Sequence, residues 1–431
     1  MKTVIMAGGR GTRIASLAPD VPKPMIRVCG KPILEHQIAC LKQNNLTDIL
    51  IITGHLGKVI QDYCGDGSRF GCTLSYYAET EALGTAGALF KIGDKLGSDF
   101  ILINGDIIFD MDFSRFITFY RQKQADAALV VHPNSHPFDS ALLISDRENR
   151  VIHWLNKEDP RLHYKNQVNA GVHILSQNIL SAIRPGSEKI DLDREILKPQ
   201  LSTCRIFAYP TPEYIKDVGT PERYAQVTTD MEKGLVRRRN LSQRQKAVFL
   251  DRDGTINTFK GFITKPEDFE LLEGATEAIR EINHSGYLAI VITNQPVIAR
   301  GDISFEELAS IHNKMETELG KKGAYLDDIF FCPHHPDKGF PGERPAYKID
   351  CECRKPKPGM LLKAAEKYHI DLAASYMVGD SMRDVEAGRA AGCRTVLLNR
   401  NADADTEQAG KIMVFSKLQD FTQTIISRDQ P

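Results

Sequence analysis

Ala247-Val-Phe-Leu-Asp-Arg-Asp-Gly-Thr255 places two aspartates directly after a short apolar run. Near the start of the chain, Lys2-Thr-Val-Ile-Met6 leads in the same way into Ala7-Gly-Gly-Arg-Gly-Thr-Arg13. Each run predicts a buried strand that is followed by a loop of glycine and of charged or hydroxyl-bearing residues. Further apolar runs are 49–53, 100–104, 127–131, 288–293, 329–332, 376–378 and 395–398. Helix-like segments, such as 33–44 and 275–284, lie between many of these runs. This alternation predicts an α/β fold of parallel sheets between helices, with the functional loops at the carboxyl ends of the strands.

The composition narrows the class of protein. The chain has 431 residues, which is too long for one ordinary domain, and 42% hydrophobic with 26% charged residues is typical of a globular protein. A net charge of −1 does not favour a nucleic-acid partner. No apolar run approaches the ~20 residues that cross a membrane, and the start turns glycine-rich too early for a secretory signal. Nine scattered cysteines argue against a disulfide framework. We therefore expect a soluble, cytoplasmic protein without nucleic-acid or membrane partners, and a homo-oligomer stays open.

The chain divides near its middle. Residues 231–246 contain Arg237-Arg-Arg239 and several Gln and Ser residues, without sustained apolar periodicity. This composition predicts the end of a helix followed by a linker. We favour a solvated linker face over a nucleic-acid patch for the basic triplet. The predicted architecture is two Rossmann-like domains, 1–232 and 246–431, joined by a linker at 233–245.

A glycine-rich loop follows the first predicted strand. Gly8, Gly9 and Gly11 let backbone N–H groups approach a phosphate closely, and Arg10 and Arg13 add positive charge. The loop matches neither GxxxxGK[ST] nor GxGxxG, the common nucleotide-binding fingerprints. On this loop alone, a plain tight turn is as good an interpretation as a phosphate site.

Groups that suit a phosphate site recur farther along the first half. Lys23 stands between Pro22 and Pro24, which form a stiff mounting for a cation. Asp106 follows the apolar run 100–104, and Asp217 offers a second carboxylate far away in sequence. Mg²⁺ prefers such carboxylates together with substrate phosphates. For Asp217 alone, the structural role of a helix or turn cap stays open.

In order and type, these motifs resemble the sugar-1-phosphate nucleotidyltransferases over residues 1–230. The motifs are Ala7-Gly-Gly-Arg-Gly-Thr-Arg13, Pro22-Lys-Pro24, Leu83-Gly-Thr-Ala-Gly87, Asn104-Gly-Asp106, Asn169-Ala-Gly171 and Asp217-Val-Gly-Thr-Pro221. The resemblance implies a GT-A-like domain in which the 7–13 loop holds a nucleoside triphosphate, Lys23 contacts the reacting phosphates, and Asp106 and Asp217 bind Mg²⁺. It also implies substrate contacts at Gly84, Asn104, Asn169 and Gly171. In this reaction a sugar phosphate oxygen attacks the α-phosphorus and pyrophosphate leaves, so positioning and charge neutralisation dominate.

The second half carries its own set of polar strand ends. Asp251 and Asp253 suit one nucleophile and one acid/base beside a shared Mg²⁺. Three further motifs follow along the chain: Ile292-Thr-Asn-Gln295, Arg354-Lys355 and Gly379-Asp-Ser-Met-Arg-Asp384. In this order, the four motifs resemble those of the haloacid-dehalogenase-like (HAD-like) phosphatases.

That resemblance implies a role for each residue. Asp251 attacks phosphorus to form an aspartyl-phosphate, and Asp253 protonates the leaving alcohol and then activates water. Thr293 and Lys355 hold the phosphoryl oxygens. The implied Mg²⁺ ligands are Asp251, the backbone carbonyl of Asp253 and Asp380, with Asp384 orienting them.

Two pairs of soft ligands lie farther along this half. Cys332-Pro-His334 and Cys351-Glu-Cys353 match a tetrahedral structural Zn²⁺ site, with His335 as an alternative to His334. In a reducing compartment, clustered cysteines favour a metal over a disulfide. The competing interpretation is a loop with incidental thiols.

This zinc loop narrows the resemblance to the D-glycero-D-manno-heptose 1,7-bisphosphate phosphatases, with the histidinol-phosphate phosphatases as close relatives. It implies substrate contacts at Arg252, Asn294, Gln295 and Arg354. The sequence departs from the pattern at Pro296-Val297, where the family has Ser-Gly, and the 335–350 segment is longer.

The two resemblances suggest successive reactions. A phosphatase that removes the C7 phosphate leaves a sugar 1-phosphate, which the first-half family consumes. The favoured hypothesis is a bifunctional enzyme that makes GDP-heptose from GTP and D-glycero-α-D-manno-heptose 1-phosphate, with Mg²⁺ in both domains. One alternative is another sugar phosphate or nucleoside triphosphate. The other is a histidinol-phosphatase-like domain beside a nucleotide-binding domain without turnover.

Overall fold

The computed structural model describes residues 1–9, 21–182, 189–339, 341–399 and 412–427. Contacts divide the chain into two compact units. Unit 1 contains Met1–His132, Ala141–Asn156 and Gln167–Asn240, and unit 2 contains Pro133–Ser140, Lys157–Asn166 and Leu241–Pro431. The predicted linker, 233–245, includes a short helix, α7 (Leu235–Arg238), whose Leu235 and Val236 are buried in unit 1.

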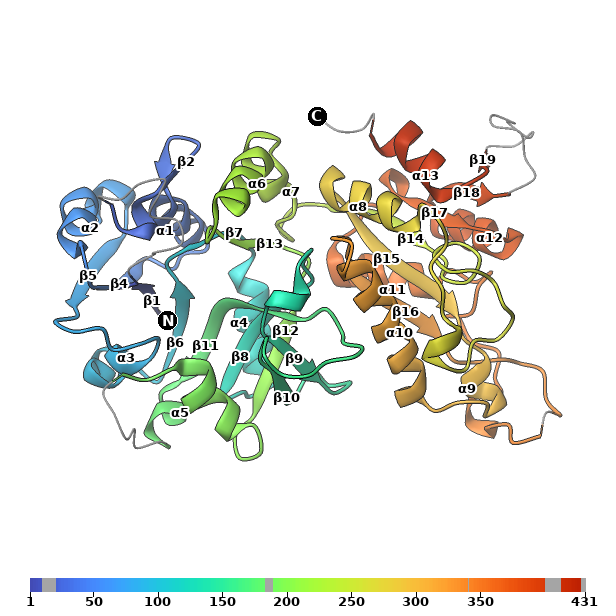
Figure 1. Cartoon of the computed structure of the whole chain (residues 1–431), viewed down its shortest axis with the longest axis horizontal. Coiled ribbons are helices and arrows are strands. Elements are labelled where there is room, and N and C mark those ends of the chain that lie inside the picture. Colours follow the sequence, from blue (N-terminus) through green and yellow to red (C-terminus); the bar gives the residue numbers. More distant parts are fainter. Residues whose placement is uncertain (10–20, 183–188, 340, 400–411, 428–431) are drawn as a thin grey trace. The chain divides into compact units, whose positions relative to one another are not determined.

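Unit 1 is built on a nine-stranded sheet with the order β10-β9-β11-β6-β1-β4-β5, and β8 and β12 continue it from β11 (Figure 1). Its strands are β1 (Lys2–Ala7), β4 (Asp48–Thr53), β5 (Thr73–Ala78), β6 (Asp99–Asn104), β8 (Ala127–His132), β9 (Leu142–Ser145), β10 (Val151–Leu155), β11 (Val168–Ser176) and β12 (Ile206–Pro210). Short pairs are formed by β2 (Arg27–Val28) with β3 (Lys31–Pro32), and by β7 (Ile107–Asp110) with β13 (Tyr214–Asp217). Its helices are α1 (Ile33–Gln43), α2 (Gly57–Cys64), α3 (Gly87–Lys91), α4 (Phe113–Gln122), α5 (Gln177–Ser181), α6 (Pro221–Glu232) and α7.

The prediction of a parallel sheet holds for only part of unit 1. Strands β5, β4, β1 and β6 run parallel. β11 runs antiparallel to β6 and to β8, and β9 and β10 are antiparallel to each other, so the sheet is mixed. Long apolar runs do not reveal strand direction, because burial on both faces gives the same composition in either direction.

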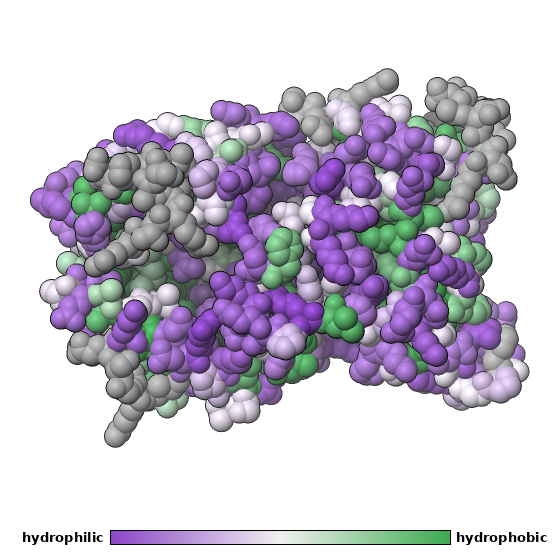
Figure 2. Space-filling model, in the orientation of Figure 1, coloured by the Kyte–Doolittle hydropathy of each residue, from purple (hydrophilic) through white to green (hydrophobic). Residues whose placement is uncertain are grey.

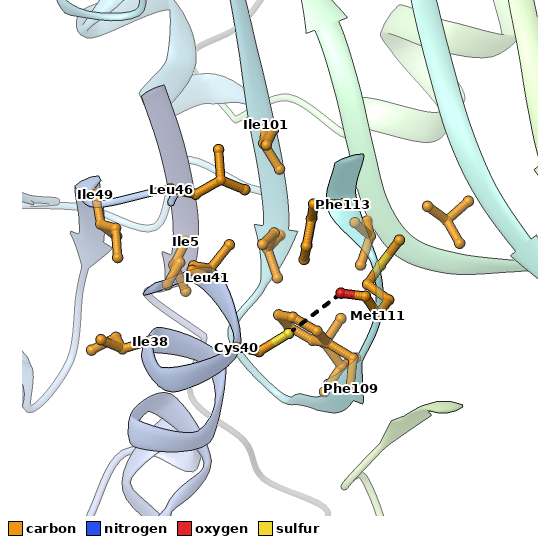
Figure 3. Close-up of a cluster of buried hydrophobic side chains, with 14 of the residues drawn as sticks. Ile5, Ile38, Cys40, Leu41, Leu46, Ile49, Ile101, Phe109, Met111 and Phe113 are labelled. Atoms are coloured by element: carbon orange, nitrogen blue, oxygen red, sulfur yellow. Dashed lines mark hydrogen bonds between the residues drawn. The ribbon is translucent and has the colours of Figure 1, made fainter. Parts of the chain in front are cut away.

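The core of unit 1 lies on both faces of this sheet. Along β1, Val4 and Ile5 are fully buried in different clusters, because successive strand side chains point to opposite faces. On one face, Ile38 and Leu41 of α1 pack with Ile5 and with Phe109 (Figure 3). The spacing of the apolar residues in α1 produces this contact, because positions three and four apart share one face of a helix.

Unit 2 is built on a six-stranded, fully parallel sheet with the order β16-β15-β14-β17-β18-β19. Its strands are β14 (Lys246–Leu250), β15 (Tyr287–Asn294), β16 (Asp328–Cys332), β17 (Tyr376–Gly379), β18 (Arg394–Leu398) and β19 (Ile412–Phe415). Its helices are α8 (Ala275–Ser285), α9 (Val297–Arg300), α10 (Phe305–Gly320), α11 (Gly359–Tyr368), α12 (Met382–Ala391) and α13 (Leu418–Phe421). After β14, the chain adds β15 and β16 on one side of it and then crosses over to add β17, β18 and β19 on the other side. Ligands bind at such a switch point in open α/β sheets.

Both surfaces of this second sheet are covered by apolar side chains. Val248 and Phe249, neighbours in β14, are fully buried in different clusters. Outside, the face drawn in Figure 2 is mostly hydrophilic, with small scattered apolar patches. In the described residues, no helix combines the length and apolar character needed to cross a membrane.

Candidate active sites

The glycine-rich loop leaves the carboxyl end of β1. At Gly8 a Cβ would lie 2.4 Å from Oε2 of Glu79, so the Glu79 carboxylate would have to shift to admit a side chain. Gly9 is exposed with open space around it. Gly11 and Arg13, like Arg10, lie outside the described residues. The described part of the loop therefore offers exposed backbone at the strand end.

Lys23 and the two predicted carboxylates of unit 1 converge beside this loop. The Lys23 ammonium forms an ion pair with Asp106. Asp217 lies in β13, opposite Ile107 of β7, and the Val218 N–H donates to the Asp106 carbonyl over 2.8 Å. The structure thus brings Lys23, Asp106 and Asp217 together from three distant parts of the sequence.

Asp217 has a cationic partner that sequence reasoning missed. Nη1 of Arg223 in α6 lies 3.0 and 2.8 Å from the two carboxylate oxygens of Asp217. Thr220 caps α6, so Arg223 comes from the first turn of the helix that follows the Asp217 motif. This proximity in sequence was the available signal.

The residues predicted to lie near the sugar form a second group. Gly171 has a φ of 72°, and a Cβ there would lie 2.4 Å from Nδ2 of Asn104, so glycine is required by conformation and by space. Asn169 accepts a hydrogen bond from the Gly171 N–H over 3.2 Å and donates to Asp193 over 3.3 Å. Burial, aided by Asp191, raises the pKa of Asp193 to about 7. Asp193 was not predicted, because nothing local distinguishes it from a surface carboxylate.

Gly84 is held on the segment that leads to Asp193. Its φ is 79°, and a Cβ would lie 2.3 Å from the Ile190 carbonyl oxygen, which accepts from the Ala86 N–H. The Thr85 hydroxyl accepts from the Leu192 N–H over 2.7 Å. The small-residue loop therefore lies directly against the 190–193 segment.

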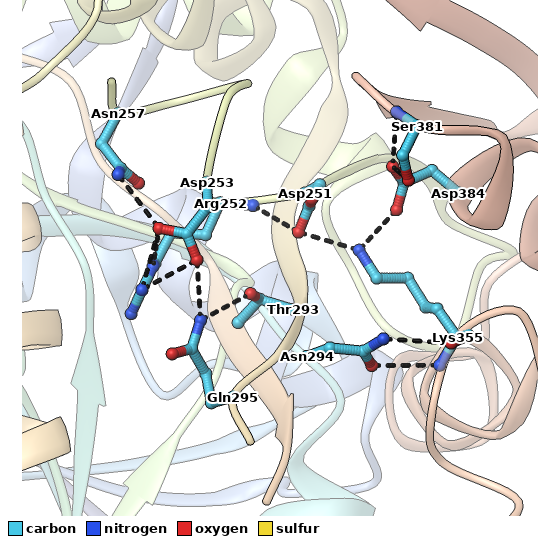
Figure 4. A network of polar contacts seen from close by, with 10 residues as sticks. All are labelled: Asp251, Arg252, Asp253, Asn257, Thr293, Asn294, Gln295, Lys355, Ser381 and Asp384. Carbon is cyan, nitrogen blue, oxygen red and sulfur yellow. Dashed lines mark hydrogen bonds and ion pairs between the residues drawn. The ribbon is translucent and has the colours of Figure 1, made fainter. Parts of the chain in front are cut away.

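In unit 2, a buried lysine lies between two carboxylates (Figure 4). The Lys355 ammonium is 2.8 Å from Oδ1 of Asp251 and 2.6 Å from Oδ1 of Asp384. Burial raises the pKa of Asp251 to about 7 despite the opposing charge of Lys355. Burial alone would lower the pKa of Lys355, but the two carboxylates raise it above its usual value. A cation bound beside Asp251 would favour its ionised form.

Asp253 is surrounded by donors. Nη2 of Arg252 lies 2.9 and 2.8 Å from its two carboxylate oxygens, and Arg252 is only 1% exposed. Gln295 donates to Asp253 over 3.0 Å and to the Thr293 hydroxyl over 2.9 Å. Asn257, which was not predicted, donates to Asp253 over 3.1 Å. Arg252 and Gln295 thus direct their polar groups at Asp253, a residue of the chain itself.

His312 lies behind Arg252. Its Nε2 is 3.3 Å from Nη1 of Arg252, and burial together with Arg252 lowers the pKa of His312 well below its usual value. A neutral imidazole accepts from the guanidinium. His312 lies within α10, and no feature of its sequence neighbourhood predicts this contact.

Asp380 completes a group of three carboxylates. Oxygens of Asp251, Asp380 and Asp384 all lie within 4.8 Å of one another. Gly254 has a φ of 86°, and a Cβ there would lie 1.9 Å from Oδ2 of Asp380, so the two loops touch where a side chain would separate them. Asp384 is also bonded to the N–H and hydroxyl of Ser381.

The predicted zinc ligands also lie together. The three sulfurs of Cys332, Cys351 and Cys353 are 3.2–3.5 Å apart, and Nδ1 of His334 is 3.3 Å from Cys353 and 3.7 Å from Cys332. His335 instead faces Asp337. Arg354 follows this cluster and donates to the His334 carbonyl over 3.1 Å. Pro296, the departure from the family pattern, caps α9 with a φ of −68°.

Known proteins match each half separately. A nucleotidyl transferase family model matches residues 2–234, and a HAD-hydrolase-like model matches 352–420. The curated D-glycero-β-D-manno-heptose-1,7-bisphosphate 7-phosphatase of Yersinia pestis is 40% identical over 190 residues, which are 44% of this chain and 99% of that protein.

Two solved structures show likeness to the separate halves. HddC from Yersinia pseudotuberculosis covers 53% of this chain and 99% of its own at 27% identity, with a TM-score of 0.47. The D,D-heptose 1,7-bisphosphate phosphatase of B. bronchiseptica, solved with magnesium and phosphate, covers 43% of this chain and 99% of its own at 33% identity, with a TM-score of 0.37.

The family model spans more than half of the chain, and the phosphatase alignment spans almost all of the relative. The chain therefore belongs to the nucleotidyl transferase family through residues 2–234 and to the D-glycero-β-D-manno-heptose-1,7-bisphosphate 7-phosphatases through its second half, as one bifunctional enzyme with a transferase and a hydrolase part.

Proposed function

We propose that this chain performs two successive steps of nucleotide-sugar synthesis. Its second half hydrolyses the C7 phosphate of D-glycero-D-manno-heptose 1,7-bisphosphate, and its first half transfers GMP from GTP to the heptose 1-phosphate, releasing pyrophosphate. The observation that carries the proposal is the union of these two families in one chain, because the phosphatase product is the class of substrate that the transferase uses. We assign the transferase to 1–232, the linker to 233–245 and the phosphatase to 246–431.

In the phosphatase reaction, a carboxylate oxygen of Asp251 attacks phosphorus while the bond from phosphorus to the C7 oxygen breaks. Asp253 gives its proton to the departing oxygen. Water then attacks the aspartyl-phosphate, Asp253 takes up a proton from that water, and inorganic phosphate leaves. Lys355, 2.8 Å from Asp251, is placed to neutralise the phosphoryl oxygens, and the Thr293 hydroxyl would donate to them.

The carboxylates of unit 2 fit a magnesium site. Asp251, Asp380 and the backbone carbonyl of Asp253 would hold Mg²⁺, whereas Asp384 is occupied by Lys355 and Ser381 and would orient the group. The ion would neutralise charge on the phosphoryl group. Arg354, anchored on the His334 carbonyl, would contact the substrate.

In the transferase reaction, the sugar phosphate oxygen forms a bond to the α-phosphorus of GTP and pyrophosphate departs. Lys23 would exchange its ion pair with Asp106 for the reacting phosphates. Asp106 and Asp217, held side by side by the β7–β13 pairing, fit two ligands of a Mg²⁺ that would neutralise those phosphates. The loop around Gly8, Gly9, Gly11 and Arg13 and the Gly84 loop would enclose the nucleotide. Asn104, Asn169 and Gly171 would lie at the sugar.

The sulfur cluster fits a structural zinc ion. Thiolates about 2.3 Å from one ion form a tetrahedron with edges of ~3.8 Å, close to the 3.2–3.7 Å separations among Cys332, His334, Cys351 and Cys353. Zinc there would hold the loop that carries Arg354 and Lys355.

The substrates can be tested by measuring phosphate and pyrophosphate release. The assay supplies α- or β-heptose 1,7-bisphosphate together with each of GTP, ATP, CTP and UTP. We expect phosphate first, then pyrophosphate only with GTP and the α-anomer, although the curated phosphatase relative is named for the β-anomer. Phosphate without pyrophosphate under every nucleotide would reject the transferase proposal. Turnover of histidinol phosphate instead would reject the heptose assignment.

Asp251→Asn should reduce phosphatase activity below detection, because an amide cannot act as the nucleophile. The same variant should convert a pre-made sugar 1-phosphate and GTP at the normal rate, measured as pyrophosphate release. Asp217→Asn is the matching variant in the other half, and it should lose transferase activity but keep phosphatase activity. Loss of both activities in a folded Asp251→Asn protein would contradict independent catalytic units.

Cys351→Ser should release the zinc ion, because a serine hydroxyl is a poor ligand beside soft thiolates. We expect the metal content of purified protein to fall by about one zinc per chain, with a rise in KM for the phosphatase as the Arg354 loop loosens. Cys393→Ser, at a buried cysteine outside the cluster, is the control. Equal zinc content in the unaltered chain, Cys351→Ser and Cys393→Ser would refute the zinc site.

A further inference from the structure

The sequence predicts Asn294 as a substrate contact. In the structure, both the amide nitrogen and the amide oxygen of its side chain are hydrogen-bonded to the backbone of one residue. Its Nδ2 donates to the Lys355 carbonyl over 3.0 Å, and its Oδ1 accepts from the Lys355 N–H over 3.0 Å (Figure 4). These two hydrogen bonds form a clamp between the last residue of β15 and the loop that follows Cys353.

The residue held by this clamp is the central cation of the phosphatase site. Its ammonium lies between Asp251 and Asp384, and the side chain is 3% exposed. A lysine carries its charge on a flexible four-carbon stem. The position of the ammonium therefore depends on where the backbone of Lys355 is anchored.

Asn294 is a firm anchor, because its own backbone belongs to the sheet. It pairs with Cys332 in the register of β15 and β16, and the next N–H, of Gln295, donates to the Cys332 carbonyl over 2.8 Å. The clamp consequently transfers the rigidity of two parallel strands to a loop that contains no regular structure around Lys355.

We propose that Asn294 is a positioning residue that holds Lys355 between Asp251 and Asp384, and that it does not contact the substrate. The inference rests on the proposed phosphatase chemistry and replaces one role within it. When Asn294 is removed, the loop keeps Lys355 but no longer fixes where its ammonium meets the phosphoryl group.

The chain offers a matched control for the loss of such a clamp. Asn283, in α8, donates to the Tyr325 carbonyl over 2.9 Å and accepts from the Tyr325 N–H over 3.0 Å. Asn283 is buried, and its two hydrogen bonds hold Tyr325 rather than a predicted catalytic residue. Asn283→Ala and Asn294→Ala therefore remove the same type of amide clamp at different places in one unit.

The test compares these two variants in the full chain. We expect Asn294→Ala to lower kcat/KM for phosphate release about a hundredfold, because small displacements of a catalytic group have effects of this size. Asn283→Ala should lower the Tm but keep kcat/KM within about threefold. Pyrophosphate release from a pre-made sugar 1-phosphate should be unchanged in both. Equal phosphatase rates for Asn294→Ala and Asn283→Ala, whether both normal or both reduced, would overturn the proposal.

A double variant separates positioning from substrate contact. If Asn294 acts only through Lys355, adding Asn294→Ala to Lys355→Ala should slow single-turnover hydrolysis by no more than about threefold further. A residue that touched the substrate would cost its full hundredfold again, and that result would also overturn the proposal. Single turnovers with enzyme in excess make the slow rates measurable.

The choice of substrate keeps this inference distinct from the proposed function. If the unaltered chain does not hydrolyse heptose bisphosphate, the sugar assignment fails, and the same variants are compared with p-nitrophenyl phosphate. Lys355 faces the phosphoryl group whichever alcohol leaves, so the predicted ratios are the same. Normal activity of Asn294→Ala on either substrate would leave the function in place and remove the role of Asn294.

Discussion

The phosphatase half depends on a buried ammonium held between two carboxylates. Taking an ion out of water costs several kcal/mol unless it is paired, and removing one partner of a buried pair costs about 3–5 kcal/mol. Lys355, Asp251 and Asp384 satisfy one another, yet Lys355 and Asp251 lie in two different loops and Asp384 lies in the first turn of α12. If one of the three is missing, an uncompensated charge stays buried and destabilises the unit. The arrangement of the proposed catalytic groups and the stability of the site are therefore linked.

This arrangement needs a rigid base, which the parallel sheet supplies. β14, β15 and β17 end at one edge, where Asn294 is the last residue of β15 and the loops that leave β14 and β17 carry Asp251 and Asp380. The loop with Lys355 belongs to no strand. It is tied to this edge by Asn294 and adjoins the sulfur cluster at Cys353, two residues earlier. Hydrogen bonds at both Arg354 and Lys355 limit the freedom of this irregular segment, which carries the cation that we propose for catalysis.

The transferase half uses the same physical solution with different parts. Lys23 and Asp106 form one ion pair and Arg223 and Asp217 form another, at the ends of paired strands. Both halves handle phosphate groups, and both keep cations beside carboxylates. In the phosphatase half this charge balance surrounds Asp251, the nucleophile that we propose. In the transferase the proposed reaction requires no protein nucleophile, so we assign the paired charges to the binding of phosphates and metal.

The sequence alone determined the two families, the order of the motifs and the nine apolar runs that form strands within one residue of their predicted ends. These features are local, because a buried strand and the polar loop after it are adjacent in the chain. Tertiary structure decided the antiparallel direction of β11, the position of Asp193 and the partners of Arg223 and His312. It also decided that Arg252 and Asn294 direct their polar groups into the protein. Such contacts join residues that are far apart in sequence or buried by their neighbours, and composition carries no record of which side chain a donor will meet.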